Sequence, residues 1–244
     1  MKLRFALILV FFILSIAIFG ATRIRGGKET DDYKNVAAIL LNGKLHCTGT
    51  LIGAKTILTA AHCLYRRENQ EKDMLVVFGS NPFQPTRGPY RVASLAYPKD
   101  PSSGFFFNPD TKADDIGVVY LEHPLTALTV TRLHHGMPSW QTILEEGRNL
   151  VFVGYGYDVI EDQPIGAGIK RDAVWPINKV ESRRVDFRVP GRNTCVGDSG
   201  GPAYIIVSGG LIQVGITSGG DHSCTYGFET RVDAMLPWLK GRVL

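Results

Sequence analysis

Short apolar runs separated by glycine, proline and other turn residues dominate the chain after residue 24. Runs of this length are typical of strands, because a longer helix would show apolar residues every three or four positions. The nine expected strands are Val36–Leu41, Thr50–Leu58, Leu75–Phe78, Val92–Ala96, Ile116–Leu121, Leu150–Gly154, Val185–Val189, Ala203–Val207 and Leu211–Ile216. A helical pattern is found at Asp233–Leu239, where Pro237 would have to lie in the first turn. The pattern predicts an all-β fold, a sandwich or a barrel, that ends in a short helix.

The 244 residues are enough for one large domain or two small ones. The stretch Thr129–Glu146 is poorer in strand signals, so we expect it to link two halves.

The N-terminus has the composition of a targeting segment. Lys2 and Arg4 precede Phe5–Ala21, which is uncharged and mostly aliphatic or aromatic. This pattern is typical of a signal peptide over residues 1–21, so we expect a secreted protein. Because the apolar run approaches the length that spans a bilayer, the alternative is a retained anchor and a periplasmic or membrane-anchored protein.

The positive charge of the chain comes largely from this segment. Loss of residues 1–23 removes Lys2, Arg4 and Arg23, so the 27 basic residues fall to 24 against 23 acidic ones. The remaining charge gives no support for nucleic-acid binding.

The exported part contains four cysteines, an even number that is expected to pair in an oxidising compartment. Four cysteines allow three pairings, and the sequence alone does not distinguish among them. Zinc binding is the alternative, but the chain has no Cys-x-x-Cys pair.

Three motifs carry residue types needed for nucleophilic catalysis. Ser199 lies in the sequence GDSGGP, His62 in TAAHC, and Asp114 and Asp115 in DDIGVV. A serine hydroxyl is a weak nucleophile unless a base takes its proton, and a carboxylate can orient that base.

These motifs, in the chain order His, Asp, Ser, resemble those of the chymotrypsin/trypsin-like serine proteases. Other serine hydrolases carry the same residue types in other orders. The resemblance covers residues 24–244 and implies two packed six-stranded antiparallel β-barrels with a short C-terminal helix. The implied boundaries are about 24–130 for the first barrel, about 140–232 for the second and about 233–243 for the helix.

The resemblance implies a role for each motif residue. Ser199 attacks the scissile carbonyl, His62 takes and returns the proton, and Asp115, which the following IGVV aligns in place of Asp114, orients His62. The backbone N–H groups of Gly197 and Ser199 form the oxyanion hole. The implied reaction is peptide hydrolysis through an acyl-enzyme, with no cofactor and no metal.

The same resemblance selects the cysteine pairs. Cys47 pairs with Cys63 beside the histidine, and Cys195 pairs with Cys224 beside the substrate pocket. The sequence Gly154–Gly156 (GYG) is similar to the Gly-Trp-Gly that opens the second barrel in many family members.

Residues 23–27 (RIRGG) resemble the activation junction of the family. Cleavage after Arg23 would free the α-amino group of Ile24, which would pair with Asp198 and order the oxyanion hole. Residues 22–23 would then be a short pro-segment and the protein a zymogen, although Arg25 departs from the usual small apolar residue. The alternative for Asp198 is a simple turn acid.

The expected substrate pocket has a neutral floor. Asn193, six residues before the nucleophile, stands where the resemblance places the floor, and a neutral floor cannot compensate a buried Lys or Arg charge. Gly220 and Gly227 match wall positions of a deep pocket, Thr194 adds a polar group, and Ser218 begins a segment that pairs with substrate backbone. We expect a large uncharged residue before the scissile bond: aromatic, Leu, Met or Gln.

The expected partners are polypeptide substrates, with a protein inhibitor and an activating protease as further candidates, and the protein is expected to be a monomer. A pocket that rejects basic residues implies that a second protease cuts after Arg23. Two alternatives stay open: a protease-like binding protein that has lost catalysis, and a protease anchored at a membrane surface.

Overall fold

The computed structural model describes residue 24 and residues 27–134, 143–156, 158–160, 163–165, 168–190, 193–221 and 223–244. The expected signal segment (1–21) and pro-segment (22–23), and part of the expected linker, lie outside these ranges. Within the described residues, no helix has the length and apolarity to cross a membrane.

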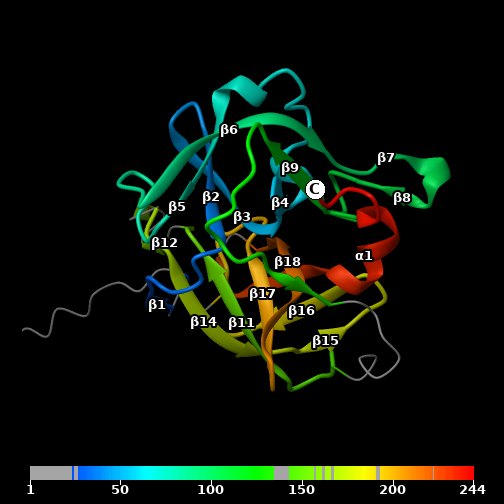
Figure 1. The fold of residues 1–244 in the computed structure, drawn as a ribbon. Helices are drawn as coiled ribbons and strands as arrows, with labels where there is room; N and C mark the ends of the chain where they lie inside the picture. The colour runs from blue at the N-terminus through cyan, green and yellow to red at the C-terminus, as the bar shows by residue number, and fades with distance from the viewer. Residues whose placement is uncertain are drawn as a thin grey trace, which may run out of the picture.

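Six antiparallel strands close into a first barrel in the order β2-β3-β4-β9-β6-β5 (Figure 1). They are β2 (Val36–Leu41), β3 (Lys44–Gly53), β4 (Thr56–Thr59), β5 (Met74–Phe78), β6 (Arg87–Ala96) and β9 (Gly117–Leu121). Alternate residues of β2 enter two cores: Ala37 and Ile39 point into the barrel, and Ala38 and Leu40 pack against the other half of the molecule. Since both faces are buried, the strand is continuously apolar.

One expected strand is two strands. Thr50–Leu58 contains the end of β3, a turn at residues 54 and 55, and β4. The carbonyls of this turn accept hydrogen bonds from Leu121 and Leu125. The apolar residues on both sides of the turn are buried, so the sequence shows one continuous apolar run and gives no sign of the turn.

The second half is a nine-stranded sheet with the path β1-β14-β11-β17-β18-β19-β16-β15, and β10 pairs with β18 beside this path. Its six longer strands are β11 (Asn149–Gly154), β14 (Arg171–Pro176), β16 (Arg184–Arg188), β17 (Pro202–Val207), β18 (Gly210–Gly220) and β19 (Tyr226–Arg231). Two short strands come from elsewhere in the sequence: β1 (Lys28–Glu29) precedes the first barrel, and β10 (Arg132–Leu133) belongs to the expected linker. The remaining strand is β15 (Lys179–Val180).

Small elements complete the described chain. They are the hairpins β7 (Lys99–Asp100) with β8 (Phe105–Phe106) and β12 (Asp158–Ile160) with β13 (Gln163–Ile165), and the 3-10 turns η1 (Ala61–Cys63), η2 (Glu71–Asp73) and η3 (Pro101–Ser103). The all-β architecture with a six-stranded barrel and a short terminal helix confirms the expected fold class.

The C-terminal helix α1 (Val232–Leu239) packs on the first barrel. The expectation that Pro237 lies in its first turn is wrong, because the helix begins at Val232 and Pro237 lies in its interior. The ring removes one backbone donor there. Met235, Trp238 and Leu239 flank the proline and are buried in the first core. Their burial stabilises the last turn of the helix despite the missing backbone hydrogen bond.

The two halves meet through a third apolar cluster. Val36, Ala38 and Leu40 of β2 contact this cluster from the first half, and Tyr155 and Tyr204 from the second. This packing fixes the two halves against each other and brings the ends of strands from both to one place.

Candidate active site

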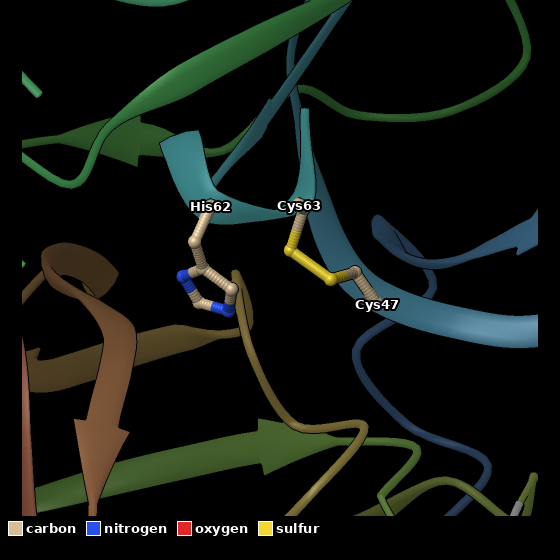
Figure 2. Close-up of side chains that lie close together, drawn as sticks. All are labelled: Cys47, His62 and Cys63. Carbon is tan, nitrogen blue, oxygen red and sulfur yellow. A yellow bond between two sulfur atoms is a disulfide. The ribbon is translucent and has the colours of Figure 1, made fainter. Parts of the chain in front are cut away.

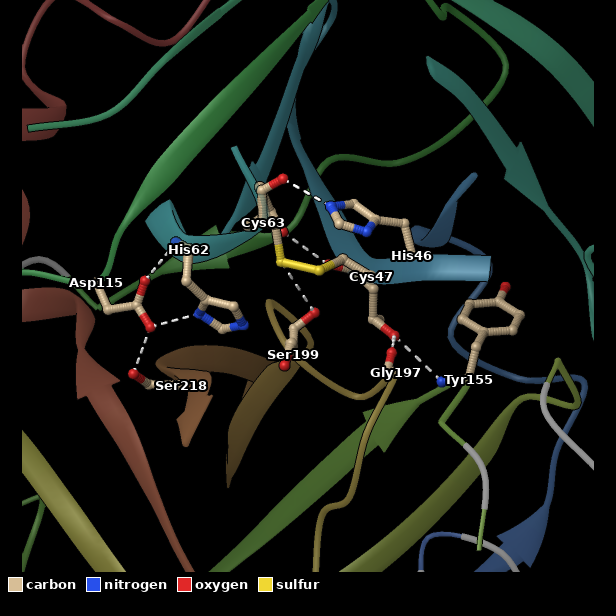
Figure 3. The surroundings of a disulfide bond; sticks show 11 residues. His46, Cys47, His62, Cys63, Asp115, Tyr155, Gly197, Ser199 and Ser218 are labelled. Atoms are coloured by element: carbon tan, nitrogen blue, oxygen red, sulfur yellow. Dashed lines mark hydrogen bonds and ion pairs between the residues drawn. A yellow bond between two sulfur atoms is a disulfide. The ribbon is translucent and has the colours of Figure 1, made fainter. Parts of the chain in front are cut away.

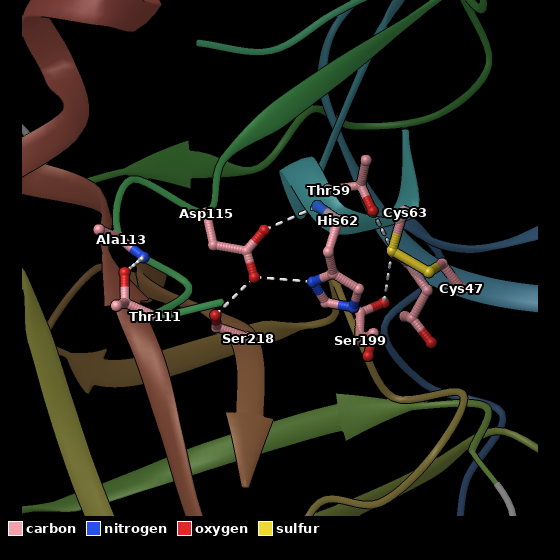
Figure 4. A network of polar contacts seen from close by, with 10 residues as sticks. Cys47, Thr59, His62, Cys63, Thr111, Ala113, Asp115, Ser199 and Ser218 are labelled. Carbon is pink, nitrogen blue, oxygen red and sulfur yellow. Dashed lines mark hydrogen bonds and ion pairs between the residues drawn. A yellow bond between two sulfur atoms is a disulfide. The ribbon is translucent and has the colours of Figure 1, made fainter. Parts of the chain in front are cut away.

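His62 and Asp115 come from neighbouring strands of the first barrel. His62 lies in η1 just after β4, and Asp115 lies just before β9, which pairs with β4. The His62 Nδ1 atom lies 2.7 Å from Asp115 Oδ2, and the His62 backbone N–H donates to Asp115 Oδ1 at 2.8 Å (Figure 4). Asp115 is wholly buried. Two contacts to one residue fix both the backbone and the ring of His62.

A third donor completes the environment of the Asp115 carboxylate. Ser218 Oγ donates to Asp115 Oδ2 at 2.5 Å and comes from β18 in the second half. The sequence prediction gave Ser218 a role in substrate binding and missed this contact. It depends on how the two halves pack, so no local sequence signal could have revealed it.

Ser199 lies in the loop before β17, and Thr48 of β3 holds this loop. The Thr48 backbone N–H donates to the Ser199 carbonyl at 2.8 Å, and Thr48 Oγ1 donates to the Gly197 carbonyl at 2.9 Å. Thr48 Oγ1 also accepts from the Tyr155 N–H at 3.2 Å. Thr48 therefore fixes the expected nucleophile on the first barrel, a role that the sequence did not suggest.

The loop has the backbone conformation that glycine permits. Gly197 has φ +96° and Gly200 has φ +82°, and a Cβ on Gly200 would collide with the Thr59 hydroxyl. The N–H groups of Asp198 and Gly200 donate to carbonyls, whereas those of Gly197 and Ser199 donate to no acceptor among the described residues. Two open N–H donors beside a serine suit an oxyanion.

Figure 3 and Figure 4 both show the His62 ring between Asp115 and Ser199. Among the described residues no hydrogen bond of standard geometry joins His62 Nε2 to Ser199 Oγ. Contacts of this kind are commonly long without substrate and shorten when it binds. The structure thus brings together the histidine, carboxylate and serine that the motifs predicted.

Asp198 is buried under the same loop. Its Oδ1 accepts from the Gly156 N–H at 2.8 Å and its Oδ2 from the Cys195 N–H at 2.9 Å. Burial raises the pKa of Asp198 to about 6, against the opposing effects of these two donors and of Arg171. Ile24 is also buried, with 1% of its surface exposed, and belongs to the core of the second sheet.

The structure confirms both expected disulfides. Cys47–Cys63 joins β3 to η1, and Cys195–Cys224 joins the serine loop to the segment before β19. Cys47, Cys63 and His62 form a compact group (Figure 2), but both sulfur atoms are in the disulfide and offer no thiolate to a metal. The group therefore gives no support to the zinc alternative.

A cavity of about 380 Å³ opens beside Ser199. Three of the five expected pocket residues, Thr194, Ser218 and Gly220, line it together with Thr217 and Lys112. The other two, Asn193 and Gly227, do not line it; they face each other, and a Cβ on Gly227 would lie 2.6 Å from Asn193 Oδ1. Lys112 and Thr217 were not singled out in the sequence, because neither belongs to a catalytic motif.

Known proteins share this sequence pattern. The model of a family described as Trypsin matches residues 24–239. Vitamin K-dependent protein C of Rattus norvegicus is 30% identical over 233 residues, which cover 83% of this chain and 47% of that protein. Coagulation factor IX of Oryctolagus cuniculus is 28% identical, with 89% and 83% covered. Brachyurin of Leptuca pugilator is 28% identical, with 89% and 97% covered. The chain thus spans about half of the first relative and nearly all of the last.

Proposed function

The chain belongs to the trypsin family of serine proteases, and we propose that it is a secreted endopeptidase whose polypeptide substrates carry an uncharged residue before the scissile bond. The observation that carries the proposal is the position of the His62 ring, between a buried carboxylate and a serine in a glycine-rich loop. Membership of a family of proteases supports a polypeptide substrate.

The reaction follows from the geometry. Ser199 Oγ attacks the substrate carbonyl as His62 Nε2 takes its proton, and the open N–H groups of Gly197 and Ser199 stabilise the negative oxygen. Asp115 keeps a proton on Nδ1 of His62 and stabilises the imidazolium. His62 then gives the proton to the leaving amine, and water releases the acyl group by the same steps in reverse order.

The protein is made as a zymogen in this proposal. Asp198 is a buried acid that accepts hydrogen bonds from two backbone N–H groups, and a cationic α-amine would compensate its charge. Cleavage after Arg23 supplies such an amine at Ile24. Because Asp198 precedes Ser199 and bonds the serine loop, its pairing would order the two oxyanion donors.

The preference for an uncharged residue rests on Asn193, which is buried and carries no charge to compensate Lys or Arg. A second protease would then cleave after Arg23. We further propose a monomer that a protein inhibitor regulates.

Hydrolysis of a mixed peptide library tests the function. A chain that begins at Ile24 should cleave the library, and the same chain with Ser199→Ala should not. Cleavage mainly after Arg or Lys would contradict the proposed preference, and a chain that binds peptides without cleaving any would favour the binding-protein alternative. N-terminal sequencing of the natural protein decides between a cleaved signal peptide and a retained anchor, and shows whether Ile24 is the first residue.

A further inference from the structure

Lys112 is a cation on the wall of the cavity beside Ser199 that the catalytic steps above do not use. Among the described residues that line this cavity, Lys112 alone belongs to the first half of the molecule, and the others lie between residues 194 and 224. Lys112 is three residues before Asp115, in the loop that leads into β9. A positive charge therefore lies on the side of the cavity that the first half forms.

Hydrogen bonds within this loop hold Lys112 in place. The Lys112 backbone N–H donates to the Asn108 carbonyl at 2.8 Å, and the Asn108 N–H donates to the Ala113 carbonyl at 3.1 Å. The Lys112 ammonium lies 5.7 Å from the centre of the Phe107 ring, a weak cation–π contact. Because the loop is already ordered, a ligand of Lys112 loses little affinity to the ordering of this segment.

The charges next to Lys112 compensate one another and leave it without an ion pair among the described residues. Lys112 also lines a second cavity, of about 160 Å³, together with Asp114, Glu181, Arg183 and Arg184. Arg183 forms an ion pair with Asp114, and Arg184 Nε lies 3.0 Å from Glu181 Oε2. In the described part of the chain, Lys112 is thus the cation of these two cavities that is open to a ligand.

Asp221 lines the first cavity from the second half, and its charge is directed to its own loop. Its carboxylate accepts from the Thr225 N–H at 2.7 Å and the Thr225 hydroxyl at 2.6 Å. It also accepts from the Tyr226 N–H at 3.1 Å and the Ser223 hydroxyl at 2.9 Å. Four donors compensate this carboxylate, so Asp221 neither pairs with Lys112 nor strongly repels a second carboxylate near it.

The open edge of β18 gives the direction of a substrate in the cavity. Beyond Thr217 this strand pairs with β19 on one side, and no described strand pairs with its other edge. An extended peptide can add to such an edge, and its successive side chains then point to opposite sides. Where the residue before the scissile bond points into the second half, the preceding residue points toward the first half and Lys112.

Resting on the proposed function, we propose that Lys112 selects an acidic side chain, Asp or Glu, at the second residue before the scissile bond. The ammonium group donates to the substrate carboxylate. Lys112 is partly exposed, so water solvates its charge when no acid is bound. A lysine or arginine at the same position of the substrate would meet a like charge and bind less well.

The test uses the mature chain from Ile24 and a peptide series with Glu, Gln or Lys as the second residue before the scissile bond. The residue next to the bond is the one that the mixed library shows to be cleaved best. At low salt the kcat/KM for Glu should exceed that for Gln about twofold to fivefold, the size of a partly exposed ion pair. High salt should shrink this difference.

Two variants and a matched control assign the preference to Lys112. Lys112→Gln should remove it, and Lys112→Glu should change the Glu-to-Lys ratio of kcat/KM at least about tenfold in favour of Lys. Lys72→Glu changes the net charge of the chain by the same amount, at an exposed lysine that lines neither cavity, and should retain the preference for Glu.

Equal kcat/KM for Glu and Gln in the unaltered chain would overturn the proposal, as would faster cleavage with Lys. A preference for Glu that survives in both Lys112 variants, or that Lys72→Glu also abolishes, would overturn it too. The unaltered chain decides the question even where a variant does not fold. Titration of Ser199 with a fluorophosphonate keeps the two hypotheses apart: an unreactive Ser199 defeats the proposed function, whereas a reactive Ser199 without the preference for Glu defeats this inference alone.

Discussion

Replacing Asp198 with Asn should change how the stability of the uncleaved chain depends on pH. The Asp198 carboxyl is wholly buried and its pKa rises to about 6 from an ordinary value of 3.8. Between these two values the folded chain holds a proton that the unfolded chain releases, so the free energy of unfolding falls as the pH rises. A difference of about two pKa units corresponds to about 3 kcal/mol, all of it lost above pH 6.

The assay is urea unfolding of the uncleaved chain with Ser199→Ala, which prevents self-cleavage, at a series of pH values from 4 to 7.5. The same chain with the further substitution Asp198→Asn serves as the matched comparison, because groups that do not interact with Asp198 titrate equally in both. The stability of the chain that keeps Asp198, relative to that of the Asp198→Asn variant, should fall by about 2.5 kcal/mol across this range. After cleavage at Arg23, the amine of Ile24 should lower the Asp198 pKa and remove this fall. Identical pH profiles for the two uncleaved chains would refute the reasoning.

Three further predictions concern the site and its support. Ser218→Ala removes a hydrogen bond to the Asp115 carboxylate and should lower kcat by about tenfold or more, as measured with one good peptide substrate; an unchanged kcat would contradict the role of this contact. Tyr155→Phe removes a hydroxyl that lies 2.6 Å from the Gly79 carbonyl and 3.1 Å from the Val36 carbonyl, and should cost about 1–3 kcal/mol in urea unfolding. Stability equal to that of the unaltered chain would show that these contacts contribute nothing. The activity of the mature chain should fall above about pH 8 as the Ile24 amine loses its charge, and a rate that stays constant to pH 10 would argue against the amine.

The sequence predicted the strands that are apolar along their length and missed those that bury polar groups. β14 contains Arg171 and β19 contains Glu229, both buried, so neither strand shows an apolar run or a clean alternation. The turn between β3 and β4 was missed for the opposite reason, because apolar residues continue on both sides of it. The spacing of apolar residues predicts which residues are buried. This prediction fails where a buried residue is polar, and it cannot locate a turn that has buried apolar residues on both sides.

The catalytic motifs were visible because each residue has a distinctive local sequence, and the fold brings the three side chains together. The contacts of Thr48 and Ser218 were invisible, since each joins residues that are far apart in the chain and depends on the packing of the two halves. The same holds for Glu229, whose position opposite Thr217 follows from the register between β18 and β19. Roles that follow from register or packing need the structure.

The central claim is that His62 and Asp115 activate Ser199 once Ile24 is the first residue. Mass spectrometry of the mature chain after treatment with a fluorophosphonate tests it most directly. The account predicts one adduct for each chain, located on Ser199, and little or none in a His62→Ala variant or in the chain that still carries Arg23. An adduct on another residue, or labelling of the uncleaved chain or of the His62→Ala variant equal to that of the mature chain, would contradict it.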